Sequence, residues 1–226
     1  MYVKEKFMEI AMTYKLFLEI NKKRDSETVD NYIPDKKNNE GKNPVEKFII
    51  NRTNYKKTTR ELFKIIKECE FYKTKSVNKE YDIHLKNNFS NYDLLEKIDL
   101  FTHTLNVAYE AAIDNKPKNI KSINILLALL HDFGKNQKIK NIYDKSNKKI
   151  THEKISAFFI EEFFADQVFE GNGEINKDLL KILSQTIKVQ HSSFVATNNS
   201  YLYNLRKYDK AAREKELLML RKRLQK

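Results

Sequence analysis

Hydrophobic residues recur at intervals of three and four positions along almost the whole chain, a spacing that places them on one face of an α-helix. Only four glycines and three prolines interrupt this pattern. No stretch of useful length alternates hydrophobic and polar residues as a half-buried strand would. The sequence therefore predicts an all-α fold.

The pattern divides into helical segments separated by polar ones. The expected helices cover residues 2–21, 45–71, 94–112, 119–135, 151–169, 175–191 and 202–226. The polar segment at about residues 21–44 predicts a linker, and Pro44 opens the helix that follows it. Asn91 or Asp93 is expected to cap the helix at 94–112, and Thr151 is expected to cap the helix at 151–169.

Length and cysteine content narrow the class of protein. A chain of 226 residues is long enough to bury a core of its own. Cys69 is the only cysteine, which excludes an intrachain disulfide and a zinc cluster built from cysteines. Charges interrupt the hydrophobic residues at the N-terminus, unlike a signal peptide, and no hydrophobic run approaches a membrane span. We expect a cytoplasmic protein with no membrane partner.

The net charge of +12 raises the question of a nucleic-acid partner, because clustered cations bind phosphates by releasing counterions. The excess is mostly lysine and is spread along the whole chain rather than clustered. The charge is therefore compatible with a nucleic-acid or nucleotide partner but favours neither, and a nucleic-acid partner stays open.

Four of the five histidines lie where the hydrophobic spacing points into a helical core: His103, His131, His152 and His191. His152, for example, opens a helix whose Ile155, Phe158 and Phe159 are expected to face the core. Taken singly, each histidine is more often a core or surface residue than a ligand. Together, histidines that point into one interior from different helices are what a metal site in a helical bundle requires. His84, in a polar stretch, is interpreted as structural.

The segment "LLALLHDFGKNQ" at 126–137 carries two polar residues where a buried helix ends. Burying an isolated carboxylate such as that of Asp132 costs on the order of several kcal/mol unless a cation compensates its charge. A bound metal ion would supply that cation, and the adjacent His131 would be a second ligand. The local pattern thus favours a metal site.

The order and context of these residues carry a resemblance to a known family. The sequence contains "FTHTLNVA" around His103, "LLALLHDFGK" around the His131–Asp132 pair, and "LYNLRKYDKAAR" around Asp209. It also contains "THEKISAFF" around His152. This set resembles the HD superfamily of metal-dependent phosphohydrolases, whose fold is all-α.

The resemblance covers roughly residues 93–213. It implies an HD-domain helical bundle over residues 93–226, which includes the C-terminal helix. Residues 1–92 match no motif and are interpreted as a helical N-terminal extension of unknown role. The sequence does not predict the oligomeric state.

The resemblance also implies the metal ligands. One metal ion would be held by His103, His131, Asp132 and Asp209. A second ion would be completed by His152 and His191, with Asp132 bridging the two. Mixed histidine and carboxylate ligation suits one or two divalent ions among Mn, Fe, Ni, Co and Zn, with Mg better suited to a single-ion site, and leaves the identity open.

The implied activity is the hydrolysis of a nucleotide or another phosphorylated small molecule by a metal-activated water. Asp132, His131 and Lys135 are the predicted catalytic residues. The predicted contacts to the substrate phosphate are Lys135, Arg206, Lys210 and Arg213. The competing interpretation is a solvated loop lysine for Lys135 and a solvated basic stripe for the other three residues.

Three alternatives stay open. One is an HD-type nuclease or a relaxase-like DNA-processing protein of a mobile element. Another is a helical binding module in which a metal stabilises the fold without catalysis. A third is di-iron oxygenase chemistry, which also occurs among relatives with such ligand sets. The Gly-Tyr-Pro motif of the cyclic-dinucleotide branch is missing, which argues against that branch.

Overall fold

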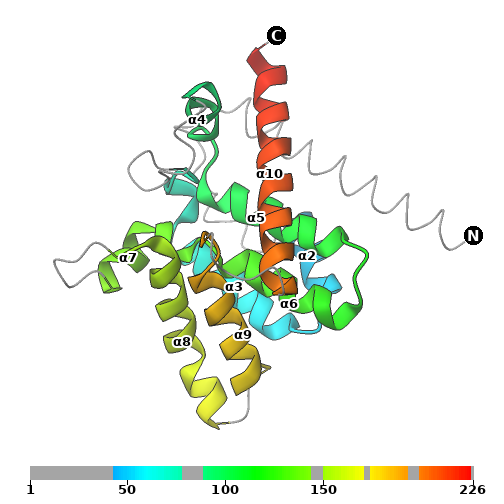
Figure 1. Cartoon of the computed structure of the whole chain (residues 1–226), viewed down its shortest axis with the longest axis vertical. Helices are drawn as coiled ribbons and strands as arrows, with labels where there is room; N and C mark the ends of the chain where they lie inside the picture. The colour runs from blue at the N-terminus through cyan, green and yellow to red at the C-terminus, as the bar shows by residue number, and fades with distance from the viewer. Residues whose placement is uncertain (1–42, 78–88, 144–149, 171–173, 193–198, 225–226) are drawn as a thin grey trace, which may run out of the picture. The chain divides into compact units, whose positions relative to one another are not determined.

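The computed structural model describes residues 43–77, 89–143, 150–170, 174–192 and 199–224. Within these residues every regular element is a helix, and the only strand-like feature is an isolated bridge between Lys75 and Asp99 (Figure 1). The prediction of an all-α fold is confirmed. The helix expected at 2–21, nearly all of the linker after it, and His84 lie outside the described residues.

The contacts within the chain divide it into two units that meet between Asn51 and Arg52. The α-helices are α2 (Pro44–Arg52), α3 (Lys56–Glu68), α4 (Phe89–Leu95), α5 (Leu100–Ile113), α6 (Lys118–Leu130), α7 (Gln137–Tyr143), α8 (His152–Glu170), α9 (Lys177–Lys188) and α10 (Ser200–Leu224). The described part of the chain also contains two short 3-10 helices, η1 (Phe71–Lys73) and η3 (Phe133–Lys135). All elements from α3 onward belong to the second unit, and this division does not test the boundary predicted at residue 93.

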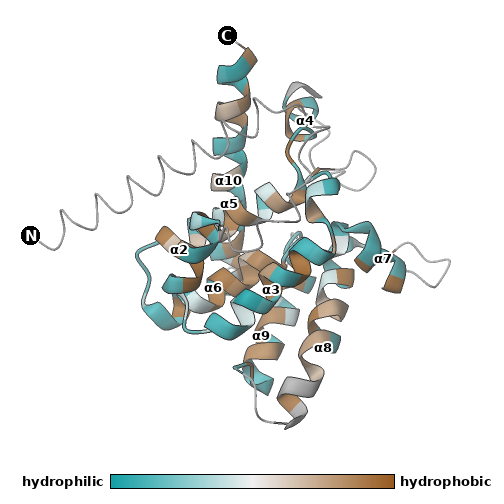
Figure 2. Cartoon of the chain, turned by 180° about the vertical axis from the view of Figure 1, so that it is seen from behind, coloured by the Kyte–Doolittle hydropathy of each residue, from teal (hydrophilic) through white to brown (hydrophobic). Residues whose placement is uncertain are grey.

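Helix α6 lies in the middle of the core of this unit. Its last six residues, from Ile125 to Leu130, are completely buried. Helices α5 and α10 pack against it, and α8 packs along α9. Figure 2 shows α6 as mostly hydrophobic, whereas the near face of α3 is largely hydrophilic. A helix that is hydrophobic on all sides is stable only when other elements surround it, so the hydrophobic run predicts the central position of α6.

Two of the predicted helices are broken by side chains that bond to the backbone. The helix expected at 45–71 ends at Arg52, and the Thr53 hydroxyl then accepts a hydrogen bond from the Tyr55 amide at 3.0 Å. The helix expected at 94–112 is interrupted where the Asp99 carboxylate accepts a hydrogen bond from the Thr102 amide at 2.6 Å. Such local bonds compete with the helical ladder.

Asp99 is therefore the N-cap of α5, and the prediction of Asn91 or Asp93 for this role is wrong because both residues lie inside the separate helix α4. The prediction that Phe158 faces the core is also wrong. Its neighbour Ile155 is completely buried, but Phe158 is 40% exposed and contacts the Tyr143 ring of α7. Within the described residues, no helix has both the length and the hydrophobicity needed to cross a bilayer.

Candidate metal centre

The turn at the end of α6 places His131 and Asp132 in the core and holds them against α8. The amide of Gly134 donates a hydrogen bond to the Ser156 hydroxyl at 2.8 Å, and this hydroxyl donates to the carbonyl oxygen of His131 at 3.1 Å. A Cβ atom on Gly134 would lie 2.1 Å from the carbonyl oxygen of His152, so only glycine allows this approach. The turn therefore brings Asp132 next to the first residue of α8.

Four predicted ligands of the first metal come together from α5, the end of α6 and α10. His103 Nε2 lies 3.1 Å from Asp209 Oδ1 and 3.8 Å from Asp132 Oδ2. His131 Nε2 lies 3.2 Å from the same Asp132 oxygen. The side chains of His103, His131 and Asp132 are at most 2% exposed, and these three residues form a group that could hold a metal ion.

A second group lies on the other side of Asp132. It contains the two predicted ligands His152 and His191 together with Glu153. Glu153 Oε1 is 3.7 Å from His152 Nε2 and 3.8 Å from His191 Nε2. The remaining oxygen of Asp132, Oδ1, lies 3.6 Å from His152 Nε2. The two carboxylate oxygens of Asp132 therefore face different groups.

Several atoms that face one another in this centre lack a hydrogen-bond partner, although Asp132 Oδ2 also lies 3.0 Å from the Lys135 ammonium. Within the described residues, the buried polar atoms without a hydrogen-bond partner include His103 Nε2, His131 Nε2, Asp132 Oδ1 and Oδ2, His152 Nε2 and Asp209 Oδ1. Leaving even one buried polar group unsatisfied costs about 1–3 kcal/mol. Several such atoms around one carboxylate would destabilise the fold if nothing bound them. Imidazole nitrogens and carboxylate oxygens are ligands of divalent cations, so these residues fit such an ion.

The hydrogen bonds on the far sides of the rings orient two of the histidines. His131 Nδ1 lies 2.8 Å from the carbonyl oxygen of Ala128, which can only accept a hydrogen bond. The proton of the neutral His131 ring is therefore on Nδ1, and Nε2 presents its lone pair to Asp132. His103 has a similar arrangement, because its Nδ1 lies 3.0 Å from Glu216 Oε1.

The charges in the centre suit metal ligation for most of the residues. Burial raises the pKa of Asp132, but His131, Lys135 and His152 outweigh burial and hold that pKa well below its usual value. Burial and Lys135 lower the pKa of His152 to about 4, and burial also lowers the pKa of His191. Near neutral pH the carboxylate is thus charged and these two imidazoles are neutral, as ligation requires.

His103 differs from the other histidines. Burial and Arg213 lower its pKa, but Glu216 and Asp209 outweigh them, and the pKa is raised above its usual value. The pKa of Asp209 is lowered in turn, because His103 and Arg213 outweigh the effect of burial. A metal ion at this position would compete with a proton on His103 Nε2.

Two of the predicted phosphate-binding residues lie at the centre. Lys135 Nζ is 3.0 Å from Asp132 Oδ2 and donates to the carbonyl oxygen of Ser76 at 3.3 Å. Arg213 Nε is 3.9 Å from Asp209 Oδ1, and the Arg213 guanidinium also donates to the Ser76 hydroxyl at 2.9 Å and to the Ser76 carbonyl oxygen at 3.0 Å. Both cations are mostly buried, with side chains 11% and 15% exposed.

The other two predicted phosphate-binding residues have different surroundings. The Arg206 guanidinium donates to the carbonyl oxygens of Gln190 at 2.7 Å and Ser192 at 2.6 Å, on either side of His191. Arg206 therefore fixes the segment that carries a candidate ligand. Lys210 is 79% exposed and lies 3.9 Å from Glu214, away from the facing ligand atoms.

Two acidic residues of the centre were missed by sequence reasoning, Glu153 and Glu216. Glu153 directly follows His152 in the first turn of α8. An acidic residue is common there because it interacts favourably with the helix dipole, so Glu153 does not by itself indicate a metal ligand. Glu216 had a usable signal. It lies four residues after Ala212 and four before Leu220, so it interrupts a buried stripe of α10 with a carboxylate.

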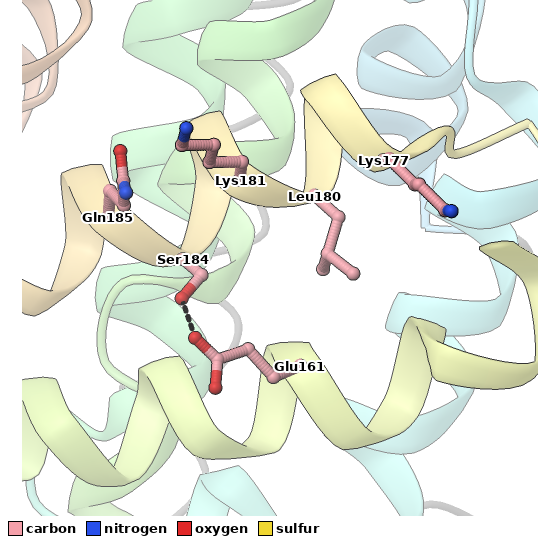
Figure 3. A pocket seen from close by; sticks show the side chains of 6 residues that line it. All are labelled: Glu161, Lys177, Leu180, Lys181, Ser184 and Gln185. Carbon is pink, nitrogen blue, oxygen red and sulfur yellow. Dashed lines mark hydrogen bonds between the residues drawn. The ribbon is translucent and has the colours of Figure 1, made fainter.

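A shallow pocket of about 260 Å³ lies between α8 and α9, and its lining contains none of the residues above. Figure 3 shows the hydrogen bond from the Ser184 hydroxyl to Glu161 across it, with Lys177 and Lys181 on the α9 side. This bond ties the two helices together, and we assign the pocket no part in the metal centre.

No family model, curated protein or solved structure matches the chain. The resemblance to the HD superfamily thus remains a prediction from the residues around His103, His131, Asp132, His152 and Asp209.

Proposed function

We propose that the chain is a metal-dependent phosphohydrolase of the HD type that hydrolyses a nucleotide or another phosphoester. One observation carries the proposal. Side chains chosen from the sequence as ligands supply the unsatisfied buried atoms around Asp132, and they come from three helices, α5, α8 and α10, and from the turn that ends α6. Asp132 belongs to one of the two groups that could hold a metal ion, and its Oδ1 lies 3.6 Å from His152 Nε2 of the other group.

The residues of the chain have separate roles in this proposal. A divalent ion bound there would polarise a phosphate oxygen and lower the pKa of a water molecule. Asp132 would hold the two groups of ligands together through its two oxygens. Lys135, 3.0 Å from Asp132, would supply a positive charge to an anionic substrate in the same space.

The exposure of the ligands indicates the side from which a substrate would approach. The side chains of His191 and Asp209 are 37% and 31% exposed, whereas those of His103, His131 and Asp132 are almost completely buried. The open side thus lies between the end of α9 and the middle of α10. Arg213, on α10 and 3.9 Å from Asp209 Oδ1, would be a mostly buried cation close to a phosphate that contacts Asp209.

The test combines metal content with turnover. We expect the purified protein to bind one or two divalent ions and to release nitrophenol from a phosphomonoester or phosphodiester in the presence of Mn²⁺. Asp132→Asn should abolish turnover and remove most metal binding. Asp178→Asn changes an exposed acidic residue of α9 in the same way and should change neither. Failure of the metal-reconstituted wild-type protein to bind metal or to turn over these substrates would refute the proposal.

A polynucleotide is the second candidate substrate. Helix α3 carries exposed cations at spacings that place them along one face: Lys56, Lys57, Arg60, Lys64 and Lys67. Such a face attracts a phosphate backbone more than a small substrate. Cleavage of single-stranded DNA or RNA that is lost in Asp132→Ala would favour this candidate, and indifference to polynucleotides would exclude it.

A further inference from the structure

The carboxylate of Glu216 is buried beside the proposed metal centre but does not face the group of ligand atoms. Its side chain is completely inaccessible to solvent, as is that of His103. Glu216 lies two helical turns after Asp209 on α10, so both carboxylates are on the side of the helix that faces α5. One side of the His103 ring therefore meets Asp209, and the other side meets Glu216.

Every oxygen of Glu216 has a donor. Oε1 lies 3.0 Å from His103 Nδ1 and accepts a hydrogen bond from Asn106 Nδ2 at 2.8 Å. Oε2 accepts a hydrogen bond from Arg213 Nη1 at 3.3 Å. Arg213 is itself held by two hydrogen bonds to Ser76. Glu216 is thus a fully partnered carboxylate in a rigid position rather than an additional ligand.

This arrangement determines which nitrogen of His103 carries the proton when the ring is neutral. A carboxylate only accepts hydrogen bonds, so Nδ1 must be the donor to Glu216 Oε1. The lone pair is then on Nε2, which faces the oxygens of Asp132 and Asp209 at 3.8 and 3.1 Å. Outer carboxylates that hold a ligating histidine in this way also fix the orientation of its ring.

We propose that Glu216 is a positioning residue that keeps His103 in the tautomer whose Nε2 binds the metal ion. The inference rests on the proposed metal centre and adds a residue that acts through His103. Glu216→Gln is nearly isosteric, but it cannot satisfy all of the neighbours. If its oxygen faces His103 and Asn106, its amide group faces the Arg213 cation. If it is reversed, the amide donates to His103 Nδ1 and moves the proton to Nε2.

The experiment uses Zn²⁺ as the probe with the full chain. Competition with a chromogenic chelator should show that Glu216→Gln lowers Zn²⁺ affinity by about 10–100-fold. Glu214→Gln is the matched control, because Glu214 lies on the same helix, is 65% exposed and pairs with Lys210. Its Zn²⁺ affinity should equal that of the wild type.

A second readout follows the tautomer itself and does not depend on the Glu216→Gln variant. In the Zn²⁺-loaded wild-type protein with ¹⁵N-labelled histidine, the His103 signal should show a proton on Nδ1. Loss of that signal in His103→Gln assigns it. A proton on Nε2 of His103 in the wild type would overturn the inference, as would wild-type Zn²⁺ affinity in a folded Glu216→Gln protein. If the wild-type protein binds no Zn²⁺, the proposed metal centre fails, and the inference fails with it. If the wild-type protein binds Zn²⁺ but His103 carries its proton on Nε2, only the inference fails.

Discussion

Gly134 lies directly against the main chain of His152. A Cβ atom on Gly134 would be 2.1 Å from the carbonyl oxygen of His152 and 2.9 Å from Ile155 Cβ. No side chain fits in this space, so the glycine allows the turn after Asp132 to meet the first turn of α8. The contact joins the two groups of the candidate metal centre, because the first group lies on one side of it and His152 on the other.

Gly134→Ala should therefore weaken both the fold and metal binding. A methyl group in this position forces backbone to move rather than a flexible side chain, and overpacking of this kind costs about 1–3 kcal/mol. We expect a decrease of that size in the free energy of unfolding, measured by denaturant titration. The displacement of α8 should also reduce the number of bound Mn²⁺ ions, because His152 and Glu153 move with it.

Gln137→Ala, at an exposed position three residues further along, is the matched control and should leave both measurements unchanged. A Gly134→Ala protein with wild-type stability and wild-type metal content would contradict the close packing of this turn.

Metal binding should stabilise the folded chain strongly. The ligand atoms converge only in the folded protein, so a cation that binds them stabilises this state by about 2.7 kcal/mol at a hundredfold excess over its dissociation constant. For a chain of this size, that corresponds to a rise in melting temperature of about 5–10 °C. Thermal unfolding with and without a chelator measures the difference.

Asp132→Asn provides the comparison for this prediction. Without the shared carboxylate, the chelator should no longer change the melting temperature. If the chelator lowers the melting temperature of the wild type but nitrophenol release is absent under all metal conditions, the centre has a stabilising role and the non-catalytic alternative is favoured. Equal melting temperatures of the wild type with and without metal would argue against the centre itself.

Tyr208 joins α10 to the loop after α5, and its ionisation should make stability depend on pH. Its hydroxyl donates to Asp114 Oδ2 at 2.6 Å and accepts from Asn124 Nδ2 at 3.2 Å. Burial and then the Asp114 carboxylate raise the pKa of Tyr208 above its usual value of 10.0. The folded state therefore keeps the proton at a pH where the unfolded chain releases it.

The direction of the pH effect follows from this difference. The contribution of Tyr208 is fully present below pH 10 and decreases as the pH rises beyond 10, because ionisation then stabilises the unfolded chain. Tyr208→Phe should be less stable than the wild type at neutral pH by about 1–3 kcal/mol, since it leaves buried polar groups without a partner. The difference should shrink as the pH rises above about 10. Tyr203→Phe, at a position that is 68% exposed, should match the wild type throughout, and a constant deficit of Tyr208→Phe at all pH values would refute the prediction.

The hydrophobic pattern predicted the helices in which buried residues recur at intervals of three and four positions. Helix α6 is the strongest case, since its continuous hydrophobic run required a central position. The same reasoning found the candidate ligands, because His103, His131 and Asp132 are polar residues at buried positions. The breaks at Thr53 and Asp99 could not be predicted in the same way, because they depend on single hydrogen bonds between a side chain and the backbone.

The roles of the charged residues were harder to predict than the positions of the ligands. A basic residue on a helix indicates a cation on that face but not its partner. Arg206 and Lys210 belong to the same predicted stripe, yet one holds the main chain around His191 and the other is 79% exposed. Only the packing of α10 against the segment after α9 distinguishes them, and the spacing of residues within one helix does not predict which neighbour that helix packs against.

Arg206 and Lys210 offer a direct comparison between a positioning role and a phosphate-binding role. Arg206→Gln removes the donors to the carbonyl oxygens of Gln190 and Ser192, so the segment that carries His191 should lose its fixed position. We expect the group of His152, Glu153 and His191 to lose its metal ion. The group of His103, His131 and Asp132 should keep its ion, because none of its residues lies on or after α9. Bound metal should then fall from two ions to one in a titration with Mn²⁺.

Lys210→Gln should leave the metal content unchanged, because Lys210 contacts only the exposed Glu214 at 3.9 Å among the ion pairs of the described residues. The steady-state kinetics separate the two roles further. If Arg206 acts by holding His191, its replacement lowers kcat, and excess Mn²⁺ restores part of the loss by refilling the weakened group. If Arg206 instead binds the substrate phosphate, its replacement raises KM at full metal content and excess Mn²⁺ has no effect. This second result would contradict the positioning role that the hydrogen bonds to the His191 segment predict.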